Sequence, residues 1–111
     1  MNGTNVPTFD AMMNPVVQAL RTLGGSGTVE EIESKVAEIM GLSDVQLEEL
    51  HNPEKGDKTE FGYRLAWTRT YLKRTNVIEN SSRGIWALTA YGNKLERVDE
   101  KQITKACFGS A

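Results

Sequence analysis

The segment from residue 59 to residue 89 constrains the fold most, because a helical pattern runs directly into two short strand patterns. A helix from Thr59 or Glu60 to Arg74 is predicted by one recurring face, made of Phe61, Leu65, Thr68 and Leu72. Residues 77–80 and 85–89 are rich in β-branched and apolar side chains and flank the turn residues 81–84. Such a pattern predicts a β-hairpin directly after the helix.

Helices are also predicted upstream of this segment. Thr8 or Asp10 could cap a first helix that ends at residues 24–27, Gly-Gly-Ser-Gly, with Pro15 either in its first turns or kinking it. Residues 28–31, Thr-Val-Glu-Glu, form a capping box for a second helix over residues 29–40, which Gly41 can end.

The remaining elements are shorter. Ser43 is expected to cap an acidic helix over residues 44–50, and residues 51–58 read as an exposed loop, so that 43–58 looks like an insert between helices. Thr89 is expected to cap a last helix that ends near Val98, with Tyr91, Leu95 and Val98 facing inward.

This order of elements predicts a mainly α fold with a small β-hairpin (α+β), of the winged helix-turn-helix type. We expect a flexible N-terminus over residues 1–7 and one domain over residues 8–98. Residues 99–111 are expected to be a polar tail or the start of an interdomain linker.

Composition narrows the classes of function. The chain has one cysteine, Cys107, and one histidine, His51, which argues against disulfides and multi-cysteine zinc sites. No apolar run approaches the roughly 18 residues of a membrane span, and no secretory leader is visible. We therefore expect a cytoplasmic protein that does not act at a membrane.

The net charge of −2 hides an asymmetry. Between residues 62 and 86, five basic residues stand against one acid, Glu79, and the rest of the chain is correspondingly acidic. A basic helix and turn on an acidic body is the pattern expected of a nucleic-acid reader. The residues expected to contact double-stranded DNA are Tyr63, Arg64, Arg69, Thr70, Lys73, Arg74, Ser81, Ser82 and Arg83.

The basic segment has two other interpretations. The charges could simply form a solvated helix face, which is how most charge runs end up. The aromatic side chains could stack on single-stranded bases, but aromatic residues at helical spacing are more often core residues, so they are expected to be structural. These side chains are Trp67, Tyr71 and Trp86.

No catalytic residue is predicted. Residues 33–35, Glu-Ser-Lys, and 99–101, Asp-Glu-Lys, match the (D/E)-x-K end of a nuclease motif, but both fall on predicted helical or polar segments without a partner aspartate on a preceding strand. No cofactor or metal is therefore expected in this chain.

Specific residues resemble the N-terminal winged-helix domain of Mrr-type restriction endonucleases, which are type IV, modification-dependent enzymes. The resemblance covers about residues 7 to 95. Its motifs are Pro7-Thr8-Phe9-Asp10, Met13-x-Pro15-Val16-x-x-Ala19-Leu20, Arg64-x-Ala66-Trp67-x-x-Thr70-Tyr71-Leu72-Lys73 and Ile78-Glu79-x-x-x-Arg83-Gly84-x-Trp86-x-Leu88-Thr89-x-x-Gly92. Thr75-Asn76 departs from an Ala-Gly pair common in the family, although Asn tolerates the left-handed conformation.

The resemblance implies a target-recognition module for DNA, in some cases methylated, that precedes a separate Mg²⁺-dependent nuclease domain. The chain is then an excised domain or a stand-alone relative. Its partners would be double-stranded DNA, the nuclease domain and, to enlarge a small footprint, a second copy in a homodimer.

The alternative is a winged-helix module that docks on a protein without binding DNA. Its contact would be an acidic surface made of Glu30, Glu31, Glu33, Glu38, Glu48 and Glu49.

Overall fold

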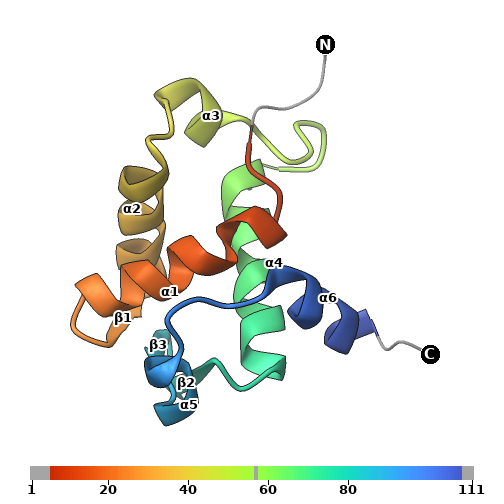
Figure 1. Cartoon of the computed structure of the whole chain (residues 1–111). Helices are drawn as coiled ribbons and strands as arrows, with labels where there is room; N and C mark the ends of the chain where they lie inside the picture. Colours follow the sequence, from red (N-terminus) through yellow and green to blue (C-terminus); the bar gives the residue numbers. More distant parts are fainter. Residues whose placement is uncertain (1–5, 57, 109–111) are drawn as a thin grey trace.

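The computed structural model describes residues 6–56 and 58–108, and Figure 1 shows their arrangement. The element order confirms a mainly helical α+β fold with a small antiparallel sheet. The elements are η1 (Asp10–Met12), α1 (Met13–Thr22), β1 (Ser26–Thr28), α2 (Val29–Met40), α3 (Asp44–Glu48), α4 (Glu60–Arg74), β2 (Ile78–Ser82), β3 (Ile85–Leu88), α5 (Ala90–Lys94) and α6 (Glu100–Phe108).

The helices that the sequence predicts most strongly have the expected bounds. Thr28 and Ser43 each form a capping box, at the starts of α2 and α3. Gly41 ends α2 in the left-handed conformation, with φ 65°. Asn76 also has a positive φ, 66°, which confirms that it takes the conformation a glycine would take there.

The first helix starts differently from the prediction. A short 3₁₀ turn, η1, precedes α1, and no side chain caps either element, so the expected caps at Thr8 and Asp10 are wrong. Pro15 is the third residue of α1. The missing amide of a proline costs nothing there, because the first amides of a helix have no partner within it. The helix is therefore continuous from Met13.

The sheet has three strands in the order β1-β3-β2, and β3 pairs antiparallel with both neighbours. Strand β1 was not predicted, because Gly25-Ser26-Gly27 signals only the end of a helix; the edge of β3 provides the backbone partners that make it a strand. The hairpin β2–β3 is the wing, and the order helix, strand, helices, hairpin is that of a winged helix.

The turn of the wing is shorter than predicted. Asn80 pairs with Trp86 and Ser82 pairs with Ile85, so Ser81 is the extra residue of a bulge. Ser81 and Ser82 therefore belong to β2, and the turn is Arg83-Gly84 alone. Gly84 has φ 76°, which a glycine adopts without steric cost.

One hydrophobic core joins the helices to the wing. Thr68 is fully buried within it, and its hydroxyl lies 2.7 Å from the carbonyl oxygen of Phe9, to which it donates. Tyr91, expected to face inward, is 52% exposed instead, and α5 ends at Lys94 rather than near Val98. Buried core residues include Met12, Met13, Val16, Leu20, Ile32, Val36, Phe61, Leu65, Tyr71, Leu72, Val77, Ile78, Val98 and Ile103.

Both ends of the domain are more ordered than expected. Val6 is buried, and the carbonyl oxygens of Val6 and Pro7 accept hydrogen bonds from Arg64, while residues 1–5 of the segment expected to be flexible lie outside the described residues. Residues 100–108 form α6 rather than a polar tail, and Ile103 is buried. The side chain of Asn14 holds the entry to α6, because it both donates to the Val98 carbonyl and accepts from the Val98 amide.

Candidate nucleic-acid interface

A groove of about 570 Å³ runs along the exposed face of α4. The opposite face of the helix carries Phe61, Leu65, Thr68 and Leu72 into the core, so the groove occupies the side that the sequence predicts for contacts with a ligand. Small residues of α4 keep the groove open, in particular Gly62 and Ala66. Its lining is Glu33, Lys58, Thr59, Gly62, Tyr63, Ala66, Trp67, Thr70 and Arg74.

Tyr63 is positioned by the loop that precedes α4. The ring of His51 stacks on the Tyr63 ring with centroids 3.7 Å apart and planes inclined by 18°. The ammonium group of Lys58 lies 5.6 Å from the centroid of the same ring. In Figure 1 this loop lies at the top of the molecule and the wing at the bottom. The groove therefore lies along the helix that joins these two ends.

Three predicted cations are free of described partners and point into solvent. Lys73 and Arg74 are exposed in the last turn of α4, and Arg83 is exposed in the turn of the wing. Ser81 and Ser82 are also exposed, in the bulged end of β2. These side chains are available to phosphate groups in the way the sequence predicts.

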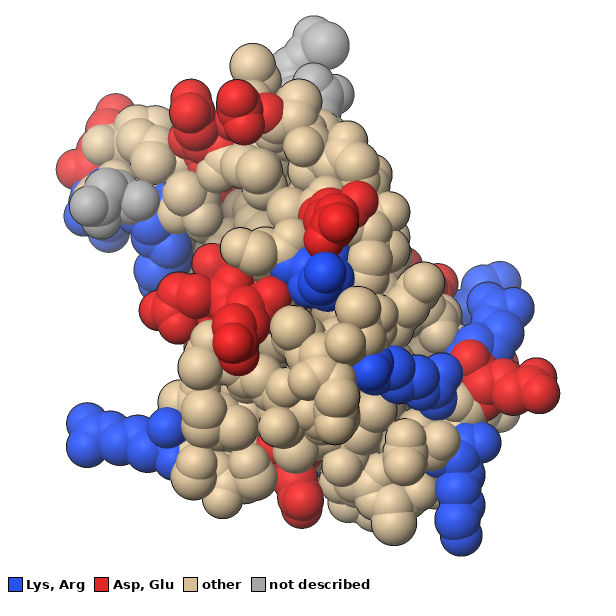
Figure 2. Space-filling view, turned by 90° about the vertical axis from the view of Figure 1, so that its left-hand side faces the viewer, with Lys and Arg blue, Asp and Glu red and all other residues tan. Residues whose placement is uncertain are grey.

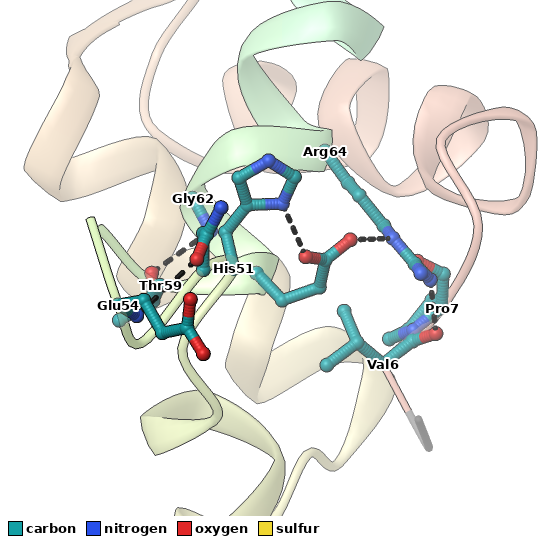
Figure 3. Close-up of polar contacts among 9 residues, drawn as sticks. Val6, Pro7, His51, Glu54, Thr59, Gly62 and Arg64 are labelled. Atoms are coloured by element: carbon teal, nitrogen blue, oxygen red, sulfur yellow. Dashed lines mark hydrogen bonds and ion pairs between the residues drawn. The ribbon is translucent and has the colours of Figure 1, made fainter. Parts of the chain in front are cut away.

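Arg64 is engaged within the domain. Its guanidinium donates to the Glu60 carboxylate and to the carbonyl oxygens of Val6, at 2.9 Å, and Pro7, at 3.3 Å. Figure 3 shows His51 and Arg64 approaching the carboxylate between them from two sides. Arg64 thus links the start of α4 to the N-terminal segment, which argues against its predicted role as a DNA contact.

Arg69 is half-buried between α4 and the wing. Its guanidinium carbon lies 5.5 Å from the centroid of the Trp86 ring, and its Nε and Nη1 atoms are buried without a hydrogen-bond partner. Burial lowers the pKa of Arg69, and the nearby Glu33 carboxylate partly offsets that effect. This location also argues against Arg69 as a direct DNA contact, because a buried cation cannot reach a phosphate without moving.

Thr70 lines the groove as predicted, but its hydroxyl hydrogen is already used. The Oγ1 atom donates to the Ala66 carbonyl at 3.0 Å, one turn earlier in α4. The hydroxyl oxygen retains its lone pairs, so in this arrangement Thr70 offers an acceptor to the groove rather than a donor.

Trp67 was assigned to the core from its spacing, and this is wrong. Its side chain is 40% exposed and forms a ridge between the groove and a second hollow beside it. Tyr71 and Trp86 are structural, as expected, since Tyr71 is buried and Trp86 packs against the core. The second hollow is lined by Thr8, Phe9, Asp10, Tyr63, Arg64, Trp67 and Tyr71.

Sequence reasoning missed other groove residues. Glu33 comes from α2 and Lys58 from the loop, and neither shares a periodic pattern with α4. Gly62 could have been predicted as a groove residue from the sequence, because a glycine within a helix often has a packing or functional reason. A Cβ atom built on Gly62 would lie 3.4 Å from Glu33 Oε2 and 3.0 Å from Thr59 Oγ1.

The acidic residues do not form one continuous surface. In Figure 2 acidic and basic side chains alternate over the face that carries α2, and neither sign covers it. Glu38 pairs with Lys35 at 2.9 Å, Glu31 closes the capping box of α2, and Glu33 faces the groove. The acidic docking surface of the alternative interpretation is therefore divided.

Within residues 6–56 and 58–108, no three His, Cys, Asp or Glu side chains gather where they could hold a metal ion. The two (D/E)-x-K segments lie in α2 and at the start of α6. None of the described helices is long and apolar enough to cross a membrane.

Comparison with known proteins identifies the family. The model of the Mrr N-terminal domain matches residues 9–97, which is most of the chain. The chain belongs to the Mrr N-terminal domain family. The match ends before α6, and it includes the whole of the wing and the groove-bearing helix α4.

A curated relative agrees with this assignment. The type IV methyl-directed restriction enzyme EcoKMrr of Escherichia coli (strain K12) is 29% identical to this chain over 87 residues. The matched segment is 78% of this chain but 28% of that enzyme, so the chain spans little more than a quarter of the relative's length. No solved structure matches the chain.

Proposed function

We propose that this domain binds double-stranded DNA and serves as the target-recognition part of a restriction protein. The observation that carries the proposal is the groove on the exposed face of α4, in a winged helix of the Mrr N-terminal family. A B-DNA major groove admits one α-helix, and α4 offers polar and small side chains outward while its other face is packed.

The proposed contacts differ from the sequence-based set. Lys58, Lys73, Arg74 and Arg83 contact phosphates at the two ends of α4, with Ser81 and Ser82 as additional donors from the wing. Tyr63 and Thr70 face base edges from the middle of the groove. Arg64 and Arg69 act indirectly, by holding the N-terminal segment and the wing against α4.

A preference for methylated DNA is supported by the name of the E. coli relative, which is methyl-directed. In this domain the exposed ring of Trp67 beside Ala66 is the apolar surface that would contact a methyl group in the major groove. The nuclease activity would reside in a separate domain, with its own Mg²⁺ ions, and this domain would hold that nuclease at the target.

The test is a fluorescence-anisotropy titration of the domain with matched unmethylated and methylated duplexes over a salt series. Binding with a steep negative dependence on salt would support phosphate contacts. Lys73→Glu with Arg74→Glu should abolish binding while circular dichroism shows an intact fold. Lys101→Glu with Lys105→Glu, the same charge change on α6, should weaken binding much less, because no residue of α6 lines the groove.

The result against the proposal is a folded wild-type domain that binds no duplex at low salt. Protein docking would then become the leading function. Exposed acidic residues, such as Glu30 and Glu48, would then be the first to substitute in a search for the docking surface.

A further inference from the structure

Glu33 is an acidic side chain in a groove that the proposed function assigns to DNA. Among the described residues that line this groove it is the one carboxylate, and it reaches the groove from α2 rather than from α4. A negative charge near phosphates weakens binding unless the carboxylate receives hydrogen bonds in return. A carboxylate in this groove is therefore compatible with DNA binding if a group of the DNA donates a hydrogen bond to it.

The Glu33 carboxylate accepts no hydrogen bond from the residues that the structure describes. Within residues 6–56 and 58–108, no amide, hydroxyl or cationic side chain donates to it, although it is half-buried. Burial raises the pKa of Glu33, the charge of Arg69 lowers it, and Glu30 raises it further. A ligand donor that binds such a carboxylate contributes more binding free energy than one that binds a fully hydrated carboxylate. The reason is that the half-buried group has already lost part of its water.

Arg69 supports Glu33 but cannot replace it as the group that contacts a ligand. The unpaired Nε and Nη1 atoms of Arg69 are buried, and its guanidinium lies over Trp86. The positive charge of Arg69 favours the ionised form of Glu33. Glu33 is the member of the pair that lines the groove.

The surroundings leave room for a base edge. Glu33 Oε2 lies beside Gly62, and Ala66 follows about one turn later on the groove side of α4, so two small residues of the helix border this part of the groove. A carboxylate accepts hydrogen bonds and cannot donate them, which excludes a direct contact with phosphate oxygens, N7 or O6. The donors in the major groove are the exocyclic amino groups of cytosine and adenine.

We infer that Glu33 accepts a hydrogen bond from the exocyclic amino group of one target base, N4 of cytosine or N6 of adenine, and thereby selects that base. This inference rests on the proposed binding of duplex DNA. It adds a specificity-determining residue from α2 to a recognition surface otherwise built on α4.

The experiment is selection from a pool of duplexes with a randomised central segment, followed by sequencing of the bound fraction. The wild-type domain is compared with Glu33→Leu and Glu33→Ala, neither of which keeps an acceptor, and with Glu48→Gln, which removes one exposed acidic charge from α3. The wild type and Glu48→Gln should enrich cytosine or adenine at one position. That preference should fall about tenfold in both Glu33 variants, a size typical of one lost base contact.

A second measurement removes the amino group from the DNA instead. In the selected duplex, pyrimidin-2-one replaces that cytosine, or purine replaces that adenine, so that only the amino group is lost. The wild type should lose about five- to tenfold in affinity, and Glu33→Ala should bind both duplexes equally, as expected when two changes remove one contact. The base whose replacement matters distinguishes cytosine from adenine.

Two results would overturn the inference while leaving the proposed function intact. In the first, the wild type binds duplexes with no base preference. In the second, both Glu33 variants bind every duplex more tightly with an unchanged preference, which would make Glu33 a group that only repels phosphates. If a folded wild-type domain binds no duplex at all, the proposed function fails together with the inference.

Discussion

The guanidinium of Arg69 lies over the ring of Trp86, 5.5 Å from its centroid, and this contact joins α4 to β3 of the wing. Two buried nitrogen atoms of Arg69 have no partner, so the contribution of this residue to stability comes from packing of its stem more than from its charge.

Arg69→Ala should therefore lower the free energy of unfolding by about 1–2 kcal/mol, since it removes buried stem atoms and the contact with the ring. Arg69→Met keeps the length and removes the unpaired donors, so it should lie within about 0.5 kcal/mol of the wild type. Urea unfolding followed by circular dichroism measures both. Equal losses in the two variants would show that the charge, not the stem, stabilises this junction.

Gly92 packs against backbone. A Cβ atom at this position would lie 2.0 Å from the carbonyl oxygen of Val77, and that oxygen cannot move independently of the strand region. Gly92→Ala should destabilise the domain by about 3 kcal/mol or more, the upper range of overpacking effects. Gly56→Ala, where a Cβ meets nothing within 4 Å, is the matched control and should change stability by less than about 0.5 kcal/mol.

Asn14 holds the segment that leads into α6. Its side chain donates to the Val98 carbonyl at 3.1 Å and accepts from the Val98 amide at 2.8 Å. Asn14→Ala should cost about 1–3 kcal/mol, because two backbone groups of a buried residue lose their partners. Hydrogen exchange at the Val98 amide should accelerate in step with the lost stability. A variant with unchanged exchange there would contradict this role.

Glu60 should contribute to stability in a pH-dependent way. Burial alone would raise its pKa, but hydrogen bonds from His51 and Arg64 outweigh burial, and the pKa lies below its ordinary value of 4.5. A carboxylate with a lowered folded-state pKa stabilises the fold above its unfolded pKa, and this contribution is lost as the pH falls through the folded value. Unfolding free energies of the wild type should therefore decline below about pH 4.5.

The control for this pH effect is Glu60→Gln. It should be less stable than the wild type at pH 7 and should show a flatter acid limb. Glu33 acts in the opposite sense, because its pKa is raised by burial, so its protonation as the pH falls favours the folded state. Glu33→Gln should therefore make the acid decline steeper, which separates the two carboxylates experimentally.

Arg83 should contribute one phosphate contact. It is exposed in the two-residue turn of the wing, and a contact between one cation and one phosphate accounts for about 0.9 of the slope of log K against log salt. Arg83→Ala should reduce the magnitude of that slope by about this amount and weaken binding similarly for all sequences. Lys105→Ala, on α6, should leave the slope unchanged. A change of base preference in Arg83→Ala would instead point to a minor-groove contact.

Local sequence signals predicted the helices that carry the interface. The bounds of α2 follow from the capping box at Thr28 and those of α4 from an apolar face that repeats every three to four residues, while the cap at Thr59 is seen in the structure. Interactions of this kind involve residues within one turn of each other, so they can be read directly from the chain. The same holds for the left-handed conformations of Gly41 and Asn76.

Features that depend on distant partners could not be predicted in this way. Strand β1 exists because β3 pairs with it, and α6 is ordered because Ile103 packs in the core and Asn14 holds Val98. Trp67 and Tyr71 have similar local signals, but Tyr71 is buried and Trp67 is 40% exposed. Which of the two aromatic rings is buried depends on how the helices and strands pack against each other.

The sequence by itself thus determined the winged-helix order of elements, the amphipathic helix α4 and the cations available at its end, because these follow from local periodicity and capping. Only the tertiary structure decided which cations remain free. It buried Arg69 against the wing, tied Arg64 to the N-terminal segment and brought Glu33 and Lys58 into the groove. The physical reason is that burial and hydrogen bonding depend on neighbours in space, and hydrogen-bonded neighbours here are up to 86 positions apart in the chain.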